Sequence, residues 1–383
     1  MSSLPLIAFS HLRWDFVYQR PQHLLSRFAQ DRCVVVIEEP VHDPHAAPHW
    51  EQHHPHPNVT VFRPHTPCAA WGFADAQLPY LHRLTERLVQ EAPLQRGLVW
   101  MYTPMALPLI DVFEPEVIIF DCMDELSAFD LAPPQLVERE HQLFTRADLV
   151  FTGGPSLYRV KKHRHPNVHL FPSSVDAAHF RQALDGLPEP ADQVLLPRPR
   201  LGFFGVLDER LDRPLLAHLT AAHPDWQVVL IGPVVKIDPA LLPQAPNLHY
   251  LGQRSYEMLP AYLAGWDICL LPFARNAATQ FISPTKTLEY MAAERPIVST
   301  SITDVREPYG DIVYLGDTPE AFVAACERAL ASSQEERAQR AEKMHAVLKH
   351  TSWDATVAAM QRLIEAVRQR GPAWASAAVE DRL

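Results

Sequence analysis

The feature that most constrains the fold is an alternation of short apolar runs with helical patterns, which occurs twice along the chain. In the first half, the apolar runs are "LPLIAFS", "RCVVVIEEP", "GLVWMYTP", "EVIIFDCMD" and "ADLVFTGG". Runs of this length, separated by helices, are typical of parallel strands buried on both faces of a sheet. The pattern therefore predicts a doubly wound α/β domain.

A second cycle of the same kind begins after a proline-rich interruption. Between Phe171 and Arg200 the repeated prolines disfavour regular elements, and "RLGFFGVLD", "WQVVLIGPV", "DICLLPF" and "DIVYLGD" then restart the alternation. The 383 residues are enough for two domains with full cores. We expect a first domain over 1–172, a hinge over 173–199, a second domain over 200–350, and a C-terminal helix over 351–383 that packs back towards the first domain.

Both domains should belong to the open, doubly wound type, in which ligands bind beyond the carboxyl ends of the strands. Two such Rossmann-like sheets facing across a cleft would place the function between the domains.

Charge and hydropathy exclude several other classes. A net charge of −11 argues against a broad nucleic-acid surface. No apolar run approaches the ~20 residues of a membrane span, and the N-terminus lacks a basic start followed by a long apolar segment. The five cysteines are scattered, and three lie within apolar runs, as reduced core residues do. The sequence predicts a cytoplasmic protein.

The stretch "FISPTKTLEYMAAERPIVSTS", residues 281–301, predicts an anion site. Pro284 suits the start of a helix, and Thr285, Lys286 and Thr287 bring hydroxyls and a cation to its positive end. Phosphate is the anion that such an end usually binds. Glu289 should lie one turn further in, roughly 6 Å along the axis, within reach of a ribose attached to that phosphate.

Polar residues also follow the predicted strands of the first half. One cluster comes directly after the first strand, before a helix that Pro21 should start. Others end two later strands, at "MYTP" and "FDCMDEL". Because carboxyl ends of parallel strands face the ligand, we expect these side chains to line the site: His11, Arg13, Asp15, Arg20, Tyr102, Asp121, Asp124 and Glu125.

A histidine-rich stretch, "HDPHAAPHWEQHHPHP" at 42–57, invites a metal-site interpretation. Its four prolines and the absence of cysteine leave no regular ligand face. We interpret it as a surface loop.

In the second half the ordered motifs resemble those of GT-B glycosyltransferases, especially the family 4 type. "VHLFPSSVDAAHF" is similar to the family's hinge, with Ser173 and Ser174 in place of Asn and Gly. "FFGVLDERLD", "WQVVLIGP", "NLHYLGQRSYEMLPAYLAGWDICLLPF" and "TLEYMAAERPIVST" then follow in family order. The resemblance implies a GT-B fold and transfer of a sugar from a nucleoside diphosphate sugar, with a UDP-sugar as the first candidate.

One position departs from the family pattern. The family carries two glutamates with seven residues between them, the second on the ribose and the first near the donor sugar. Counting back from Glu289 places Phe281 at the first position. The sugar hydroxyl groups must then be bound by other side chains, and retaining chemistry does not follow from this motif.

The resemblance also implies which residues hold the substrates. Electrostatic stabilisation of the departing diphosphate should be the largest contribution to catalysis. The implied nucleotide and diphosphate contacts are Gly205, Arg210, Arg213, Arg254, Ser283, Thr285, Lys286, Thr287 and Glu289. GT-B enzymes commonly act without a metal, and no Asp-x-Asp sequence falls in a suitable loop, so we expect neither a metal nor a cofactor.

The acceptor is expected to be a hydroxyl compound bound by the first domain: a polysaccharide, a glycolipid or a small glycoside. If the reaction inverts configuration, a base must lie within hydrogen-bond reach of that hydroxyl, and the candidates are Asp124, Asp15 and His11, in that order. If it retains configuration, the leaving phosphate takes the proton and these groups position the acceptor. Peripheral membrane contact and the choice between monomer and homodimer stay open.

Two alternatives share the fold. A UDP-GlcNAc 2-epimerase would interconvert the donor without an acceptor, and a non-catalytic scaffold would bind nucleotide sugar without turnover. Turnover that requires an acceptor separates the transferase from both.

Overall fold

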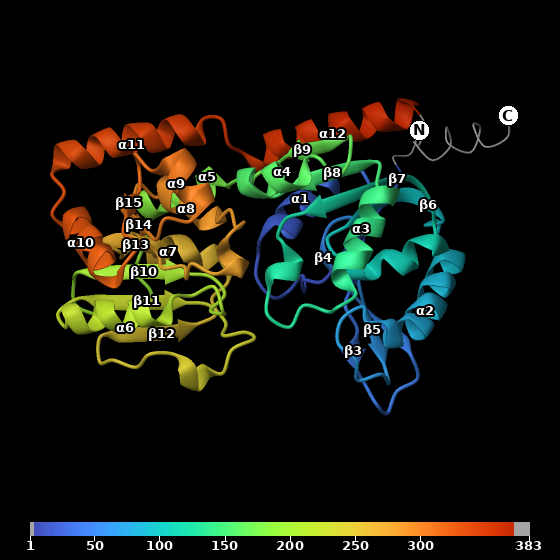
Figure 1. Cartoon of the computed structure of the whole chain (residues 1–383), viewed down its shortest axis with the longest axis horizontal. Helices are drawn as coiled ribbons and strands as arrows, with labels where there is room; N and C mark the ends of the chain where they lie inside the picture. The colour runs from blue at the N-terminus through green and yellow to red at the C-terminus, as the bar shows by residue number, and fades with distance from the viewer. Residues whose placement is uncertain (1–3, 371–383) are drawn as a thin grey trace. The chain divides into compact units, whose positions relative to one another are not determined.

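The computed structural model describes residues 4–370, and contacts divide this part of the chain into two compact units (Figure 1). The first unit runs to Pro172 and resumes at Asp354, and the second spans Ser173–Trp353. The last residues of the expected C-terminal segment, 371–383, lie outside the described range.

A nine-stranded sheet forms the centre of the first unit, in the order β3-β5-β2-β1-β6-β7-β8-β9, with β4 paired to β5. All neighbouring pairs are parallel except β4 and β5. The strands are β1 (Leu6–Ser10), β2 (Val34–Glu38), β3 (Val41–His42), β4 (His49–His56), β5 (Val59–Thr66), β6 (Arg96–Met101), β7 (Glu114–Cys122), β8 (Leu149–Thr152) and β9 (Val168–Leu170).

Helices lie between most of these strands, as the alternation predicts, and a last helix follows the second unit. They are α1 (Arg20–Phe28), α2 (Leu78–Glu91), α3 (Leu136–Arg146), α4 (Pro155–Lys161) and α12 (Trp353–Arg370), with short 3-10 turns η1 (Asp75–Gln77), η2 (Pro104–Val112) and η3 (Leu126–Ala128). Every residue of β1 and β2 is buried, because a central parallel strand is covered on both faces.

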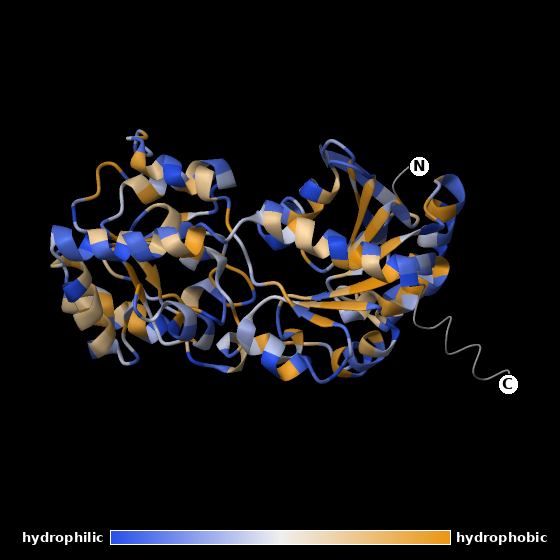
Figure 2. Ribbon diagram, turned by 90° about the horizontal axis from the view of Figure 1, so that it is seen from above, coloured by the Kyte–Doolittle hydropathy of each residue, from blue (hydrophilic) through white to orange (hydrophobic). Residues whose placement is uncertain are grey.

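A six-stranded parallel sheet forms the second unit, in the order β12-β11-β10-β13-β14-β15. Its strands are β10 (Arg200–Phe204), β11 (Gln227–Ile231), β12 (Leu248–Gly252), β13 (Ile268–Leu271), β14 (Ile297–Ser299) and β15 (Tyr314–Leu315). Figure 2 shows the central strands of each unit mainly in hydrophobic colours, whereas the helices around them carry both colours. Both units are therefore doubly wound and Rossmann-like, as expected.

The helices of the second unit follow its strands in the same way. They are α5 (Ala177–Arg181), α6 (Arg213–Ala222), α7 (Leu259–Ala264), α8 (Thr285–Ala292), α9 (Thr303–Tyr309), α10 (Pro319–Leu330) and α11 (Gln334–Leu348), with 3-10 turns η4 (Gln182–Leu184), η5 (Pro239–Leu241), η6 (Tyr256–Met258) and η7 (Ala277–Thr279). Among the residues the structure describes, no helix combines the length and the apolar character needed to cross a bilayer.

The segment expected as a hinge packs into the second unit. Val175 and Phe180 are buried in that unit's core. Gln193 is fully buried, donates to the Tyr262 carbonyl and accepts from the Trp266 indole at 2.8 Å. The prolines of 173–199 thus restrict regular structure without preventing burial.

The histidine-rich stretch was wrongly expected to be a loop. Its second half, His49–His56, forms strand β4, which pairs antiparallel with β5. The register shifts between His53 and His56, around Pro55, because proline cannot donate to the ladder and is accommodated at a bulge of an edge strand.

Candidate active site

The sheet of the second unit changes direction between β10 and β13. From β10 the chain moves outwards through β11 to β12, and it then returns to the other side of β10 with β13. Ligands of open α/β sheets bind at the carboxyl ends of the strands beside such a point. A ligand site is therefore expected at the residues that follow β10 and β13.

Helix α8 begins beside this point, in the connection from β13 to β14. Pro284 precedes its first residue, Thr285, and accepts from the Thr287 amide at 3.1 Å. Thr285 and Lys286 are partly exposed, as is Ser283 just before the helix. The Thr287 hydroxyl is buried and has no hydrogen-bond partner among the described residues. This helix end offers amides, hydroxyls and a cation, as an anion site requires.

The Lys286 side chain lies against the end of β10. A Cβ atom added to Gly205 would stand 2.1 Å from Lys286 Cε and 2.8 Å from its Nζ. Gly205 also has a φ of +146°, where a side chain would be strained. The absence of a side chain at Gly205 therefore leaves the space that Lys286 occupies. The Lys286 cation lies at the carboxyl end of the central strand as a result.

Glu289 lies one turn inside α8, as expected, and only 7% of it is exposed. Burial raises the pKa of its carboxyl group to about 7, and the nearby Lys286 cation offsets only part of that shift. A buried carboxylate without strong compensation is poised to accept hydrogen bonds from a ligand's hydroxyl groups.

The arginines expected to bind phosphate differ in their surroundings. Arg210 is engaged by Asp208, with contacts of 2.6 to 3.1 Å. Arg254 donates to Asp192 at 2.6 Å and to the Tyr262 hydroxyl at 2.7 Å. Arg213, the first residue of α6, is partly exposed. Phosphate contact by Arg210 or Arg254 would require sharing or leaving these carboxylates, and it stays a prediction.

At the carboxyl ends of β1 and β7 in the first unit, Arg20 and Asp121 form a buried ion pair. Arg20 Nη2 donates to Asp121 Oδ1 at 2.8 Å, and its Nε contacts both carboxylate oxygens. Arg20 Nη1 also donates to the Phe171 carbonyl at 2.8 Å. Burial raises the pKa of Asp121, and Arg20 offsets part of the rise. In this arrangement the pair joins α1, β7 and the chain beyond β9, and it leaves neither side chain open to an acceptor.

Arg13 and Asp15 belong to another network at the same edge. Arg63 on β5 bonds Asp15 at 3.0 Å and Glu38 at 2.8 Å, and Arg13 bonds Glu38 at 3.1 Å. Burial alone would raise the pKa of Asp15, but Arg63 outweighs it and holds the pKa below the usual 3.8. A carboxylate stabilised in this way is a weak base.

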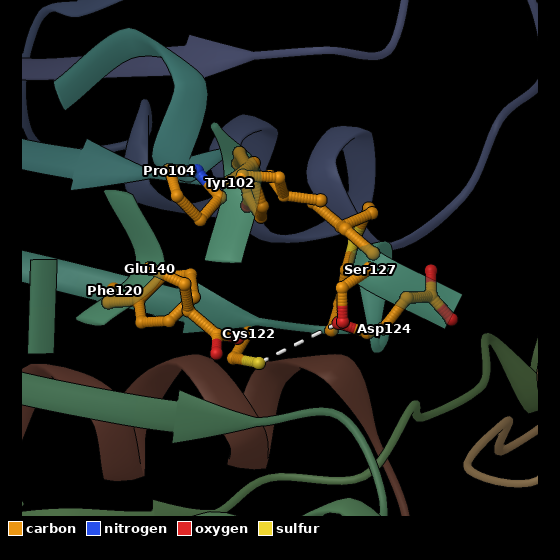
Figure 3. A pocket seen from close by; sticks show the side chains of 10 residues that line it. Tyr102, Pro104, Phe120, Cys122, Asp124, Ser127 and Glu140 are labelled. Carbon is orange, nitrogen blue, oxygen red and sulfur yellow. Dashed lines mark hydrogen bonds between the residues drawn. The ribbon is translucent and has the colours of Figure 1, made fainter. Parts of the chain in front are cut away.

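A small pocket opens at the end of β7 (Figure 3). Tyr102 and Asp124 line it together with Cys122, Ser127 and Glu140. Tyr102 is fully buried, and burial raises the pKa of its hydroxyl well above 10. The Cys122 thiol donates to the Asp124 carbonyl at 3.7 Å. The structure thus brings Tyr102 and Asp124 together, as the acceptor expectation requires. His11, which directly follows β1, is not among the lining residues.

Glu125 lies beside this pocket but is held by a buried lysine. Lys161 contacts Glu125 at 2.7 Å and Glu140 at 2.8 Å. Arg164 also pairs with Glu140. These partners leave no local signal in the sequence, because Lys161 lies 36 residues from Glu125 and 21 from Glu140.

Among the described residues, no group of three or more histidine, cysteine, aspartate or glutamate side chains could hold a metal ion. Metal-independent action was expected, and it stays a prediction.

Comparison with known proteins gives the class. Residues 198–332, which include β10 and the whole of α8, match the family Glycosyl transferases group 1. Together with the two parallel Rossmann-like units, this match indicates a glycosyltransferase of the GT-B fold.

The similar proteins are of two kinds. A teichuronic acid biosynthesis glycosyltransferase, TuaH of Bacillus subtilis strain 168, is 25% identical over 283 residues, covering 67% of this chain and 70% of the relative. The E. coli trehalose-6-phosphate structure bound with UDP-2-fluoro glucose superposes with a TM-score of 0.70 at 13% identity, over 95% of this chain and 99% of the other. Sucrose-phosphate synthase from Thermosynechococcus elongatus superposes with a TM-score of 0.67 at 15% identity, over 94% of this chain and 98% of the other. At these identities the solved structures support the fold alone.

Proposed function

We propose that this glycosyltransferase moves a sugar from a UDP-sugar to a hydroxyl group of a growing polysaccharide or glycolipid, with the second unit binding the donor and the first unit the acceptor. The observation that carries the proposal is the Lys286 side chain lying across Gly205 at the start of α8, with Glu289 buried one turn further in. That arrangement offers a cation and the positive end of a helix to a diphosphate and a carboxylate to the ribose.

On the donor side, negative charge grows on the diphosphate as the bond to the sugar breaks. Lys286 and the first amides of α8 are fixed before the reaction, so they stabilise this charge without reorganising. The hydroxyl groups of Ser283, Thr285 and Thr287 add donors at the same helix end. Arg213 contributes from the start of α6.

On the acceptor side, Asp124 is the best placed of the three candidate bases. It lines the pocket at the end of β7, whereas Asp15 is bonded by Arg63. In an inverting reaction Asp124 would take the proton of the attacking hydroxyl. In a retaining reaction the leaving phosphate would take it, and Asp124 would orient the acceptor.

The choice of substrates draws on the similar proteins. One structural neighbour is bound with UDP-2-fluoro glucose, which supports a UDP-sugar as donor. A relative assigned to teichuronic acid biosynthesis supports a polymeric acceptor. Action without a metal, a cytoplasmic location and a monomeric or homodimeric state complete the proposal.

The test is release of UDP from UDP-glucose and other UDP-sugars, with and without acceptor glycans, in buffer with and without EDTA. We expect turnover that depends on the acceptor and is insensitive to EDTA. Asp124→Asn should lower kcat, while Asp130→Asn, on an exposed loop position, should not. Conversion of the donor to an isomer without any acceptor would instead support the 2-epimerase.

A further inference from the structure

A second buried carboxylate, that of Glu209, lies on the loop that leaves Gly205. Both of its carboxylate oxygens are buried, and neither has a hydrogen-bond partner among the described residues. The residue as a whole is partly exposed, so its side chain turns the charged end inwards. An uncompensated buried carboxylate is costly and is rarely retained without a reason.

The neighbouring cation, Arg210, pairs with another carboxylate. Arg210 follows directly, but its guanidinium makes three contacts with Asp208, which is itself buried. The sequence "DER" thus carries two carboxylates, and the structure pairs only the first of them with the arginine.

The backbone around Glu209 is held against the segment that leads into α8. The Glu209 carbonyl accepts from Asn276 Nδ2 at 2.9 Å, and the Arg210 carbonyl accepts from the Ala274 amide at 2.8 Å. Leu211 and Phe273 form a β-bridge beside these bonds. The backbone at Glu209, four residues after Gly205, is therefore held against the loop that leads to Lys286.

We propose that Glu209 binds hydroxyl groups of the donor sugar. This inference rests on the proposed function, because it assigns a further subsite to the same donor site. A carboxylate can only accept hydrogen bonds, and sugar hydroxyl groups are donors that would satisfy both oxygens at once. Phe281, which offers no polar group to a sugar, lies on the approach to α8 and leaves that task to another residue.

The inference predicts that substitution of Glu209 changes the affinity for one of two related ligands and not for the other. The nucleoside diphosphate lacks the sugar, so its affinity should not depend on Glu209, whereas that of the nucleoside diphosphate sugar should. We expect Glu209→Gln and Glu209→Ala to raise the Kd of UDP-glucose, or of the UDP-sugar with the highest turnover, by about tenfold or more and to leave the Kd of UDP within about twofold. Both constants are measured by calorimetric titration.

A stability measurement separates this role from a structural one. If the Glu209 carboxylate is paired only when a ligand is bound, Glu209→Gln removes an unpaired charge and should raise the Tm of the unliganded protein. A structural carboxylate would give a lower Tm on substitution. Glu342→Gln, on an exposed face of α11, is the matched control and should change neither Tm nor either Kd.

The outcomes distinguish this inference from the proposed function. Unchanged affinity for the UDP-sugar in both Glu209 variants, or an equal loss for UDP and the UDP-sugar, would overturn the role of Glu209 while leaving the nucleotide site in place. A parent protein that binds neither ligand would contradict the proposed function and, with it, the inference.

Discussion

The carboxyl edges of the two sheets differ in whether their buried carboxylates have cationic partners. In the first unit, the buried carboxylates of Asp121, Glu38 and Glu140 each have an arginine or lysine partner. In the second unit, the carboxylate of Glu289 is only partly offset by Lys286, and Glu209 has no partner among the described residues. The first edge is held together by its own ion pairs, while the second, besides the pair that buried Asp208 forms with Arg210, holds carboxylates that a ligand would satisfy.

The largest effect we expect is the loss of the buried pair in the first unit. Asp121→Ala leaves the Arg20 guanidinium buried without its carboxylate and should lower the free energy of unfolding by about 3–5 kcal/mol. Urea denaturation at pH 7 measures this change. The comparison predicts that nucleotide affinity stays unchanged in any fraction that folds. A loss below about 1 kcal/mol would contradict the structural role of the pair.

A second prediction concerns pH and the second unit. Burial raises the pKa of Glu289 to about 7 from its ordinary value of 4.5, so the folded state binds the extra proton between these values. Stability due to this group is present below about pH 4.5 and is lost as the pH rises through 7. Glu289→Gln should therefore stabilise the unliganded protein relative to the parent by up to about 3 kcal/mol at pH 8 and by little at pH 5.

Denaturation of parent and variant at both pH values checks this. The same variant should bind nucleotide more weakly, since the amide cannot replace the charge that accepts from ribose hydroxyl groups. A stability difference that is independent of pH would show that Glu289 is ionised without penalty and would remove the contrast between the two edges.

The smallest expected effect is at Asp15, whose ion pair with Arg63 is largely exposed. Its side chain is 59% exposed, so Asp15→Asn should lower the free energy of unfolding by less than about 1 kcal/mol. The lowered pKa of Asp15 means that any contribution is present above pH 4 and is lost as the pH falls through its folded pKa. A loss of several kcal/mol would place Asp15 with the buried pairs of the first unit.

The sequence predicted the features that depend on local patterns. A strand such as β7 is buried on both faces, so its apolar run is continuous and visible. The start of α8 was equally visible, because Pro284 and the residues after it form a local signature of a helix end. Lys286 and Glu289 follow from that start by helix geometry alone.

Features that depend on distant partners were not predictable from one chain. Arg63 lies 48 residues from Asp15, and Arg20 lies 101 residues from Asp121, so neither pairing leaves a local trace. Strand β4 was missed because its prolines argue against a strand, yet an edge position and a bulge accommodate Pro55. The role of Glu209 could not be predicted from "DER", because only the structure shows that Arg210 pairs with Asp208 and not with Glu209.

The central claim is that the start of α8 binds a nucleoside diphosphate, and calorimetric titration with UDP tests it most directly. The proteins to compare are the parent, Lys286→Ala, Gly205→Ala and the exposed-lysine control Lys349→Ala. We predict that the parent and the control bind alike, that Lys286→Ala weakens binding about 10- to 100-fold, and that Gly205→Ala does the same by displacing an intact lysine. Equal binding by all four proteins would contradict the account.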